Sequence, residues 1–295
     1  MPVDTDSRLP LLRIERFDQG AAAPILAPKV RDALAQIVDE RSHRDQLLRA
    51  GLAPSRAALF VGPPGVGKTM AAGWIAQSLG VPLAILDLSS VMSSLLGKTG
   101  INLRYAFDYA KQSECVLFLD ELDAIAKRRG DDSDVGELKR LVTVLLQQID
   151  DWPSSAGLVL GATNHPDLLD PAVWRRFDTS VPFDVPGIEL RAQAIERFGD
   201  GMLTPVSVAT LAASTDGASF SDLERQILRL RRNAVIHETS AAQLEDAVLA
   251  DVRKLDLPER LRIAMALNGS GRSQRQISSI TGISRDTLRK HLART

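Results

Sequence analysis

The residues with the clearest chemistry form a glycine-rich loop, GPPGVGKT, at positions 62–69, directly after an apolar run at 57–61. In such a loop the glycines let main-chain amides close around phosphate oxygens, Lys68 can reach the terminal phosphates, and the Thr69 hydroxyl can bind Mg²⁺. The loop therefore predicts binding of ATP with Mg²⁺. The residues expected to contact the nucleotide are Gly62, Pro63, Pro64, Gly65, Val66, Gly67, Lys68, Thr69 and Met70.

A second apolar run, VLFLDELD at 116–123, ends in acidic residues. Asp120 is placed to hold the Mg²⁺ shell together with Thr69, and Glu121 is placed to polarise an attacking water. The loop alone indicates only that a nucleotide binds, whereas the acidic residues at the end of the strand predict that the nucleotide is also hydrolysed.

Composition limits the classes of protein. The 295 residues have room for about two domains, and 36 basic against 37 acidic residues give a net charge of −1, without general attraction to nucleic acid or membranes. The single Cys115 excludes an intramolecular disulfide and a cysteine metal site, and its position favours a buried structural thiol. No stretch approaches the ~20 apolar residues of a membrane span, and the N-terminus lacks a secretory signal, so a soluble cytoplasmic protein with no membrane partner is expected.

The elements that must position the loop follow an α/β pattern. Short β-rich runs alternate with helical periods, which is typical of a parallel sheet with crossover helices on both faces, the P-loop NTPase arrangement. Residues 1–25 read as an arm or linker, 26–186 as the α/β nucleotide-binding domain, 187–256 as an all-helical lid, and 257–295 as a small basic three-helix domain. The predicted strands are 57–62, 83–88, 115–120, 158–163 and 180–185.

The block GATNHPDLLDPAVWRRFD at 161–178 resembles the second region of homology of AAA ATPases, with WRRFD closest to the katanin and spastin branch. With the glycine-rich loop, the acidic strand and the helical lid, four motifs occur in the family's order, and the resemblance covers about 28–255. It implies an ATP hydrolase that assembles as a ring, in the family a hexamer.

The resemblance also implies roles for single residues. Asn164 matches the sensor that positions the water or the terminal phosphate, although an Asn turn before His165 is the alternative. Arg175 and Arg176 match arginine fingers that act on a neighbouring subunit, against the alternative of a solvated surface pair. Gly217 lies in a motif that packs near the adenine in the family, or is simply a glycine at the start of a helix.

Family members that remodel proteins carry an aromatic residue in a pore loop, and the matching run here is Leu95, Leu96 and Gly97. Leucine removes the flat ring that would insert between substrate side chains. Threading of a polypeptide therefore stays open. A second polar loop at 128–135 is either another pore loop or a solvated connection.

The last segment is basic, with eight Lys or Arg against two acids from Pro258 to the end. Ser273 and Ser284 are expected to cap two helices joined by a turn at Gly282, with Ile283 between them, which resembles a helix-turn-helix domain. The alternative is that these helices extend the lid or dock a protein. The residues expected to contact double-stranded DNA are Arg275, Gln276, Arg285, Arg289 and Lys290.

The sequence thus predicts a ring-forming AAA ATPase that couples ATP hydrolysis to remodelling or regulating a protein substrate or partner enzyme, located on DNA through residues 258–295. The alternative is a peptide-threading unfoldase whose C-terminal helices bind an adaptor protein. A small-molecule kinase is disfavoured, because kinases need no paired arginines across an interface.

Overall fold

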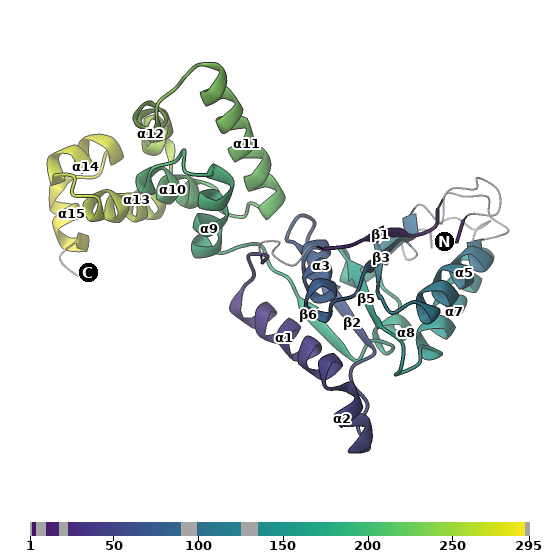
Figure 1. Ribbon diagram of the computed structural model, residues 1–295. Coiled ribbons are helices and arrows are strands. Elements are labelled where there is room, and N and C mark those ends of the chain that lie inside the picture. Colours follow the sequence, from purple (N-terminus) through teal and green to yellow (C-terminus); the bar gives the residue numbers. More distant parts are fainter. Residues whose placement is uncertain (1, 4–9, 18–22, 90–98, 125–134, 293–295) are drawn as a thin grey trace. The chain divides into compact units, whose positions relative to one another are not determined.

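The computed structural model describes the chain except for residues 1, 4–9, 18–22, 90–98, 125–134 and 293–295 (Figure 1). It divides into two compact units, Met1–Asp184 and Val185–Thr295. No helix in the described part of the chain is both long and apolar enough to cross a membrane.

The first unit is built on a six-stranded sheet with the strand order β1-β3-β4-β5-β2-β6. The strands from β2 to β6 pair in parallel, and β1 joins the edge antiparallel to β3. The five predicted strands are confirmed, with ends that differ by up to three residues. The three-residue strand β1 was not predicted, because it is too short to show a two-residue period. The strands are β1 (Arg13–Glu15), β2 (Ala57–Val61), β3 (Leu83–Asp87), β4 (Val116–Asp120), β5 (Leu158–Thr163) and β6 (Thr179–Pro182).

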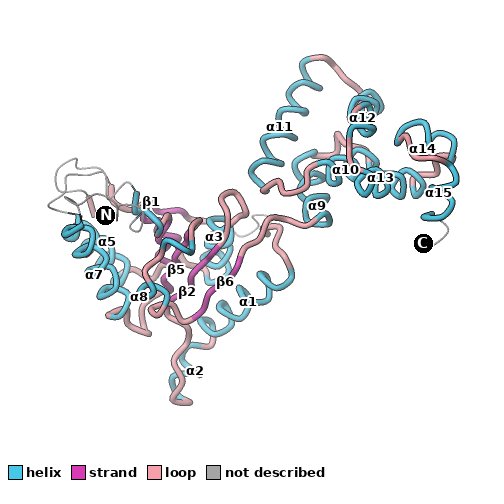
Figure 2. The backbone as a smooth tube through the Cα atoms, turned by 180° about the vertical axis from the view of Figure 1, so that it is seen from behind, coloured by secondary structure: helices cyan, strands magenta, loops and turns pink. Residues whose placement is uncertain are grey.

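Both faces of this sheet are covered by helices, as Figures 1 and 2 show. Successive side chains of β4 point to opposite faces, so Leu117 packs in one core and Phe118 in the other. A strand buried on both faces reads as a continuous apolar run, which explains the pattern of its sequence. On one face lie α1 (Pro28–Ser42) and α3 (Lys68–Leu79), and on the other α5 (Thr99–Gln112), α7 (Val135–Asp150) and α8 (Pro171–Trp174). The predicted α/β fold is confirmed.

Parallel strands place their carboxyl ends at the same edge of the sheet, where α/β proteins bind ligands. The glycine-rich loop follows β2, Asp120 ends β4, and Asn164 follows β5. In the sheet β5 lies between β4 and β2. The fold therefore brings together three motifs that are far apart in the sequence.

The described residues of the second unit form no strand, and five of its helices begin at a Ser or Thr cap whose side chain accepts from a main-chain N–H: Thr204, Ser219, Ser240, Ser273 and Ser284. On α11 an apolar face is buried at Leu223, Ile227 and Ala234. The helices are α9 (Ile188–Gly199), α10 (Pro205–Ser214), α11 (Phe220–Ile236), α12 (Ala241–Ala250), α13 (Leu257–Gly269), α14 (Gln274–Thr281) and α15 (Arg285–Leu292).

One apolar cluster joins the basic C-terminal helices to the lid helices. Ala213 of α10 and Leu249 of α12 belong to the same buried cluster as Ile263, Ile277 and Leu288 of α13, α14 and α15. The last three helices therefore share a core with the helices before them. The boundary near residue 257 stays a prediction based on charge and motif.

Candidate active site

The glycine-rich loop leads from β2 into α3, and glycine is required at its first position. A Cβ atom on Gly62 would lie 1.9 Å from the main-chain oxygen of Phe183, which no real side chain tolerates. Gly67, with a φ of 96°, occupies the left-handed region at the N-cap of α3. The loop thus turns tightly and aims the N-terminus of a twelve-residue helix at the space where phosphate would bind.

Lys68 is the central side chain of this loop. It is 8% exposed, and its Nζ donates to the main-chain oxygens of Gly62 at 2.6 Å and Pro63 at 2.8 Å, and to Oδ1 of Asn164 at 2.7 Å. Burial lowers the pKa of Lys68, opposed by the nearby carboxylates of Asp120 and Asp123. The predicted phosphate ligand and the predicted sensor are therefore brought into direct contact.

At the acidic end of β4 the Asp120 carboxylate is partly buried and lies near two other carboxylates, which disfavours its charged form. Burial raises the pKa of Asp120, and the neighbouring Glu121 and Asp87 carboxylates raise it further, whereas the hydrogen bond from the Glu121 N–H and the charge of Lys68 only partly offset this rise. Oδ1 of Asp120 accepts from the N–H of Glu121 at 3.0 Å. Carboxylate and hydroxyl oxygens are hard donors of the kind that Mg²⁺ prefers. The residues present, Asp120 and Thr69, therefore fit the predicted metal.

Glu121 follows directly with a φ of 56°, a backbone conformation that residues with side chains rarely adopt. Such conformations persist where the surrounding structure holds them, and they are frequent at active sites. The main-chain N–H of Leu122 donates to Ala162 of β5 at 2.9 Å, and the N–H of Ala124 to Glu121 at 2.8 Å. These bonds fix the turn that aims Glu121 away from the core, and the side chain is exposed.

Two acidic residues at this edge were missed by the sequence reasoning. Asp123, 2% exposed, uses Oδ1 to accept from the Thr163 hydroxyl and from the N–H of Asn164, both at 3.2 Å. Asp87 pairs in register with Asp120 and accepts from the N–H and hydroxyl of Ser89. Their positions in the sequence could have indicated both acids, because Asp87 ends an apolar strand and Asp123 lies three residues after the acid that ends β4.

The arginine pair lies at the end of α8, a short helix capped by Asp170. Arg176 is half-buried and pairs with the carboxylate of Asp150 at 3.2 Å, while its Nη1 donates to the main-chain oxygen of Ala172 at 3.2 Å. Arg175 is exposed. Within the described part of the subunit, neither arginine hydrogen-bonds to Lys68, Asp120, Glu121 or Asn164.

For the other predicted site residues, a position at this edge stays a prediction. Gly217 belongs to the second unit, where it has a φ of 74° and precedes the cap Ser219 of α11, so its role near the adenine stays a prediction. Leu95, Leu96 and Gly97 lie outside the described residues, as does most of the loop at 128–135.

The predicted DNA contacts are all exposed on α14 and α15. Gly282 ends α14 in the left-handed region, and Ser284 caps α15 by accepting from the N–H of Thr287. Gln276 also has a structural role, since its Oε1 accepts from the cap Ser273. The exposed residues are Arg275, Gln276, Arg285, Arg289 and Lys290.

Two other basic residues of the tail are used inside the unit. Nη1 of Arg260 donates to the main-chain oxygen of Thr281 at 3.2 Å, and Arg272 pairs with the buried carboxylate of Glu245 on α12. Fewer basic side chains of this segment are therefore available to bind a ligand than its net charge suggests.

Comparison with known proteins decides the family. The family model described as "ATPase family associated with various cellular activities (AAA)" matches residues 58–185. An uncharacterized AAA family ATPase of Sinorhizobium fredii is 35% identical over 234 residues, which cover 79% of this chain and 70% of that protein. The chain belongs to the AAA family. Members of the family are ATP hydrolases that use Mg²⁺, so the predicted activity and cofactors are confirmed.

More distant relatives of this AAA ATPase differ in length. An ATP-dependent zinc metalloprotease FtsH of Thermobaculum terrenum is 34% identical over 259 residues, and the match covers 82% of this chain but 40% of the metalloprotease. Among solved structures, the AAA domain of FIGL-1 superposes with a TM-score of 0.65 at 24% identity, covering 87% of this chain and 91% of that one. The same domain in complex with ADP gives 0.64 at 23% identity, covering 95% and 91%. These two likenesses show the fold.

Proposed function

We propose that this AAA ATPase works as a homo-oligomeric ring, hexameric as is usual in the family, in which Arg175 and Arg176 of one subunit complete the ATP site of the next. The observation that supports this is that, in the described part of their own subunit, the arginines make no hydrogen bond to the residues of the ATP site. Lys68, Asp120 and Asn164 form one linked cluster, whereas Arg176 is bonded to Asp150 and Arg175 is exposed.

The proposed roles follow from the chemistry of phosphoryl transfer. Lys68 binds the terminal phosphates, exchanging its main-chain and Asn164 partners for phosphate oxygens, and Thr69 and Asp120 hold Mg²⁺, which neutralises phosphate charge when bound. Glu121 takes a proton from the attacking water, and Asn164 orients that water. A finger arginine from a neighbour supplies about 10³ to 10⁵ in rate, or about 4 to 7 kcal/mol. An isolated subunit is therefore nearly inactive.

We propose further that ATP turnover in the cytoplasm is coupled to remodelling or regulating a protein partner, and that α14 and α15 place the ring on double-stranded DNA. Exposed basic side chains on two short capped helices support DNA as the ligand. The competing function is an unfoldase that threads peptides and uses these helices to bind an adaptor protein. It is favoured by the similarity to proteins named as ATP-dependent metalloproteases.

The concentration dependence of the rate tests the shared site. Specific ATPase activity per subunit should fall when the protein is diluted through its assembly range, and light scattering should show the oligomer dissociating over the same range. Full activity in a monomeric sample would contradict the proposal.

A second experiment asks which ligand stimulates ATP hydrolysis, by adding duplex DNA or an unfolded protein to the assay. Stimulation of the ATPase rate by DNA supports a ring located on DNA, and stimulation by the unfolded protein alone supports a peptide-threading unfoldase.

A further inference from the structure

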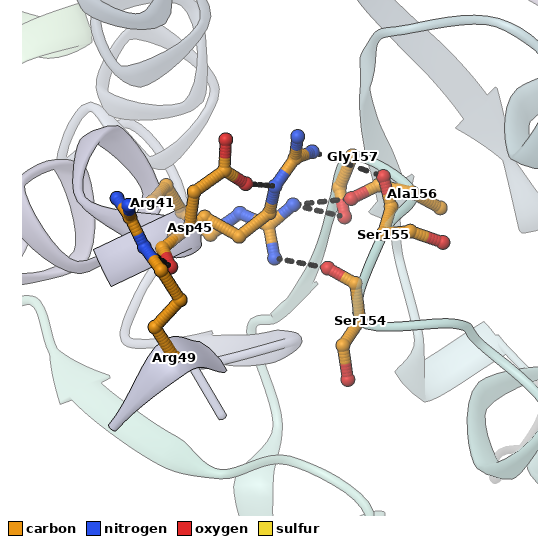
Figure 3. Close-up of polar contacts among 8 residues, drawn as sticks. Arg41, Asp45, Arg49, Ser154, Ser155, Ala156 and Gly157 are labelled. Carbon is orange, nitrogen blue, oxygen red and sulfur yellow. Dashed lines mark hydrogen bonds and ion pairs between the residues drawn. The ribbon is translucent and has the colours of Figure 1, made fainter. Parts of the chain in front are cut away.

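Two arginines of the first unit bind the main chain of one loop, which connects α7 to β5 (Figure 3). Arg41, at the end of α1, donates to the main-chain oxygens of Ser154 at 3.4 Å, Gly157 at 3.2 Å, and Ala156. Arg44, the first residue of α2 (Arg44–Arg49), donates from Nη1 to the main-chain oxygen of Ser155 at 3.1 Å. Four successive carbonyl groups are thus held by two cationic side chains.

These hydrogen bonds hold the main chain of the loop beside Trp152 and Ala156, which are buried in the core. A surface cavity of about 230 Å³ opens beside it, lined by both arginines together with Val81, Glu114 and Gly157. Burial lowers the pKa of Arg41, and the nearby charge of Arg44 lowers it further. Two like charges held together in a partly buried place are stabilised there by the carbonyl oxygens that accept from them.

The two ends of this loop are secured differently. On one side β5 is buried along its whole length and hydrogen-bonds to β2 and β4, so Asn164 at its end is positioned by the sheet. On the other side lies Asp150, the last residue of α7, whose carboxylate pairs with Arg176. Beyond Asp150 the chain is held by Trp152, which is buried in the core and donates from its indole N–H to Gly157 at 2.8 Å, by main-chain bonds such as that from the Asp151 N–H to Gln147 at 2.9 Å, and by the two arginines. The Asn164 end is thus held by strand pairing on two sides, whereas the Asp150 end depends on its helix and on contacts within the loop and to the arginines.

We propose that Arg41 is a positioning residue for the arginine pair: by holding the loop at 151–157 it fixes Asp150, and through Asp150 it fixes Arg176 for use by the neighbouring subunit. This inference rests on the proposed sharing of ATP sites between subunits. Arg41 lies on α1, remote in sequence from every residue that the site motifs include.

The first test separates binding from turnover. Arg41→Ala should lower kcat by about 10-fold or more, because small displacements of a catalytic group are costly, while KM for ATP changes little since the Lys68 loop is untouched. Arg44→Ala, which removes one carbonyl contact, should lower kcat less. Arg49→Ala is the matched control, because Arg49 is an exposed arginine of α2 that donates only to Asp45 within its own helix.

The second test asks whether Arg41 acts on its own site or on its neighbour's. In a mixture of Arg41→Ala and Lys68→Ala subunits, the Arg41→Ala sites bind ATP and receive intact arginines from Lys68→Ala neighbours. Activity above the sum of the two separate proteins supports the inference. The reference mixture is Arg176→Ala with Lys68→Ala. If the reference gains activity and the Arg41→Ala mixture does not, the inference is wrong. If the reference gains none at any ratio, the shared site itself is wrong.

Thermal unfolding of each variant accompanies both tests. If Arg41→Ala does not fold, Arg41→Lys is used, because lysine keeps the charge but its ammonium cannot span three carbonyls as a planar guanidinium does. Arg41→Lys should fold, show a lowered kcat, and gain activity when mixed with Lys68→Ala. An Arg41→Lys protein with the unaltered rate would contradict the inference.

Discussion

Asp123 holds the main chain of Asn164: its Oδ1 lies 3.2 Å from the N–H of Asn164, and the side chain of Asn164 in turn accepts from Lys68 at 2.7 Å. Asn164 is thus fixed from both sides before any nucleotide enters. The carboxylate is 2% exposed, so the contact is protected from water.

Removing this support should affect both stability and rate. Asp123→Ala leaves the Thr163 hydroxyl and the Asn164 N–H without this acceptor in a buried place, which costs about 1 to 3 kcal/mol of unfolding free energy. The displaced Asn164 should also lower kcat by about 10-fold. Urea unfolding and steady-state ATPase measurements check the two effects. A variant with wild-type stability and rate would show that Asp123 has no such role.

Lys68→Ala should weaken ATP binding by about 100-fold, because it removes the cation that is held between the glycine-rich loop and Asn164. Isothermal titration with ATP and Mg²⁺ measures the loss. The matched control is Lys111→Ala, since Lys111 is a lysine of α5 that donates to Gln148. Equal affinities of Lys68→Ala and Lys111→Ala for ATP would show that Lys68 does not bind the nucleotide.

Glu121→Gln should keep ATP binding and stop turnover, with kcat lowered by about 10³-fold or more, because glutamine cannot take the proton from water. The trapped nucleotide should also stabilise assembly, and electron microscopy of this variant with ATP should show closed rings. Turnover at the wild-type rate would refute the role of Glu121.

The raised pKa of Asp120 predicts how the stability of the nucleotide-free protein depends on pH. Its pKa is raised in the folded protein, so folding favours the protonated form, and the stability contributed by Asp120 falls as pH rises from its ordinary value of 3.8 through the raised value. At pH 7 the carboxylate is therefore a cost to the nucleotide-free protein. Asp120→Asn should have a higher Tm than the wild type at pH 7 without nucleotide, while losing Mg²⁺-dependent hydrolysis. An unchanged or lower Tm would show that burial of this carboxylate beside Glu121 and Asp87 does not destabilise the folded protein.

The DNA contacts should be visible in the dependence on salt. If Arg285 and Arg289 each meet a phosphate, the double variant Arg285→Ala with Arg289→Ala should reduce the slope of log affinity against log salt by about 2. Fluorescence anisotropy with a duplex measures the slope. Arg229→Ala, at an exposed arginine of α11, serves as the control for lost charge. An unaltered slope in the double variant would show that Arg285 and Arg289 of α15 do not contact DNA phosphates.

Elements set by local pattern were predicted correctly from the sequence. Strands buried on both faces read as apolar runs, and the glycine-rich loop, the cap Ser273 and the turn at Gly282 are encoded within a few residues. Features that depend on contacts between distant segments were not predicted, because no periodicity records them. They include the antiparallel strand β1, the support of Asn164 by Asp123, and the pair between Asp150 and Arg176.

The central claim is that an ATP site needs two subunits, and one mixing experiment tests it most directly. Arg175→Ala removes an exposed side chain but leaves its own ATP loop intact, whereas Lys68→Ala loses ATP binding but keeps its arginines. Each protein alone should be nearly inactive. The account predicts that the ATPase rate of the mixture rises above the sum of the two separate rates and passes through a maximum as their ratio is varied. A rate that equals that sum at every ratio, in samples shown to assemble, would contradict the account.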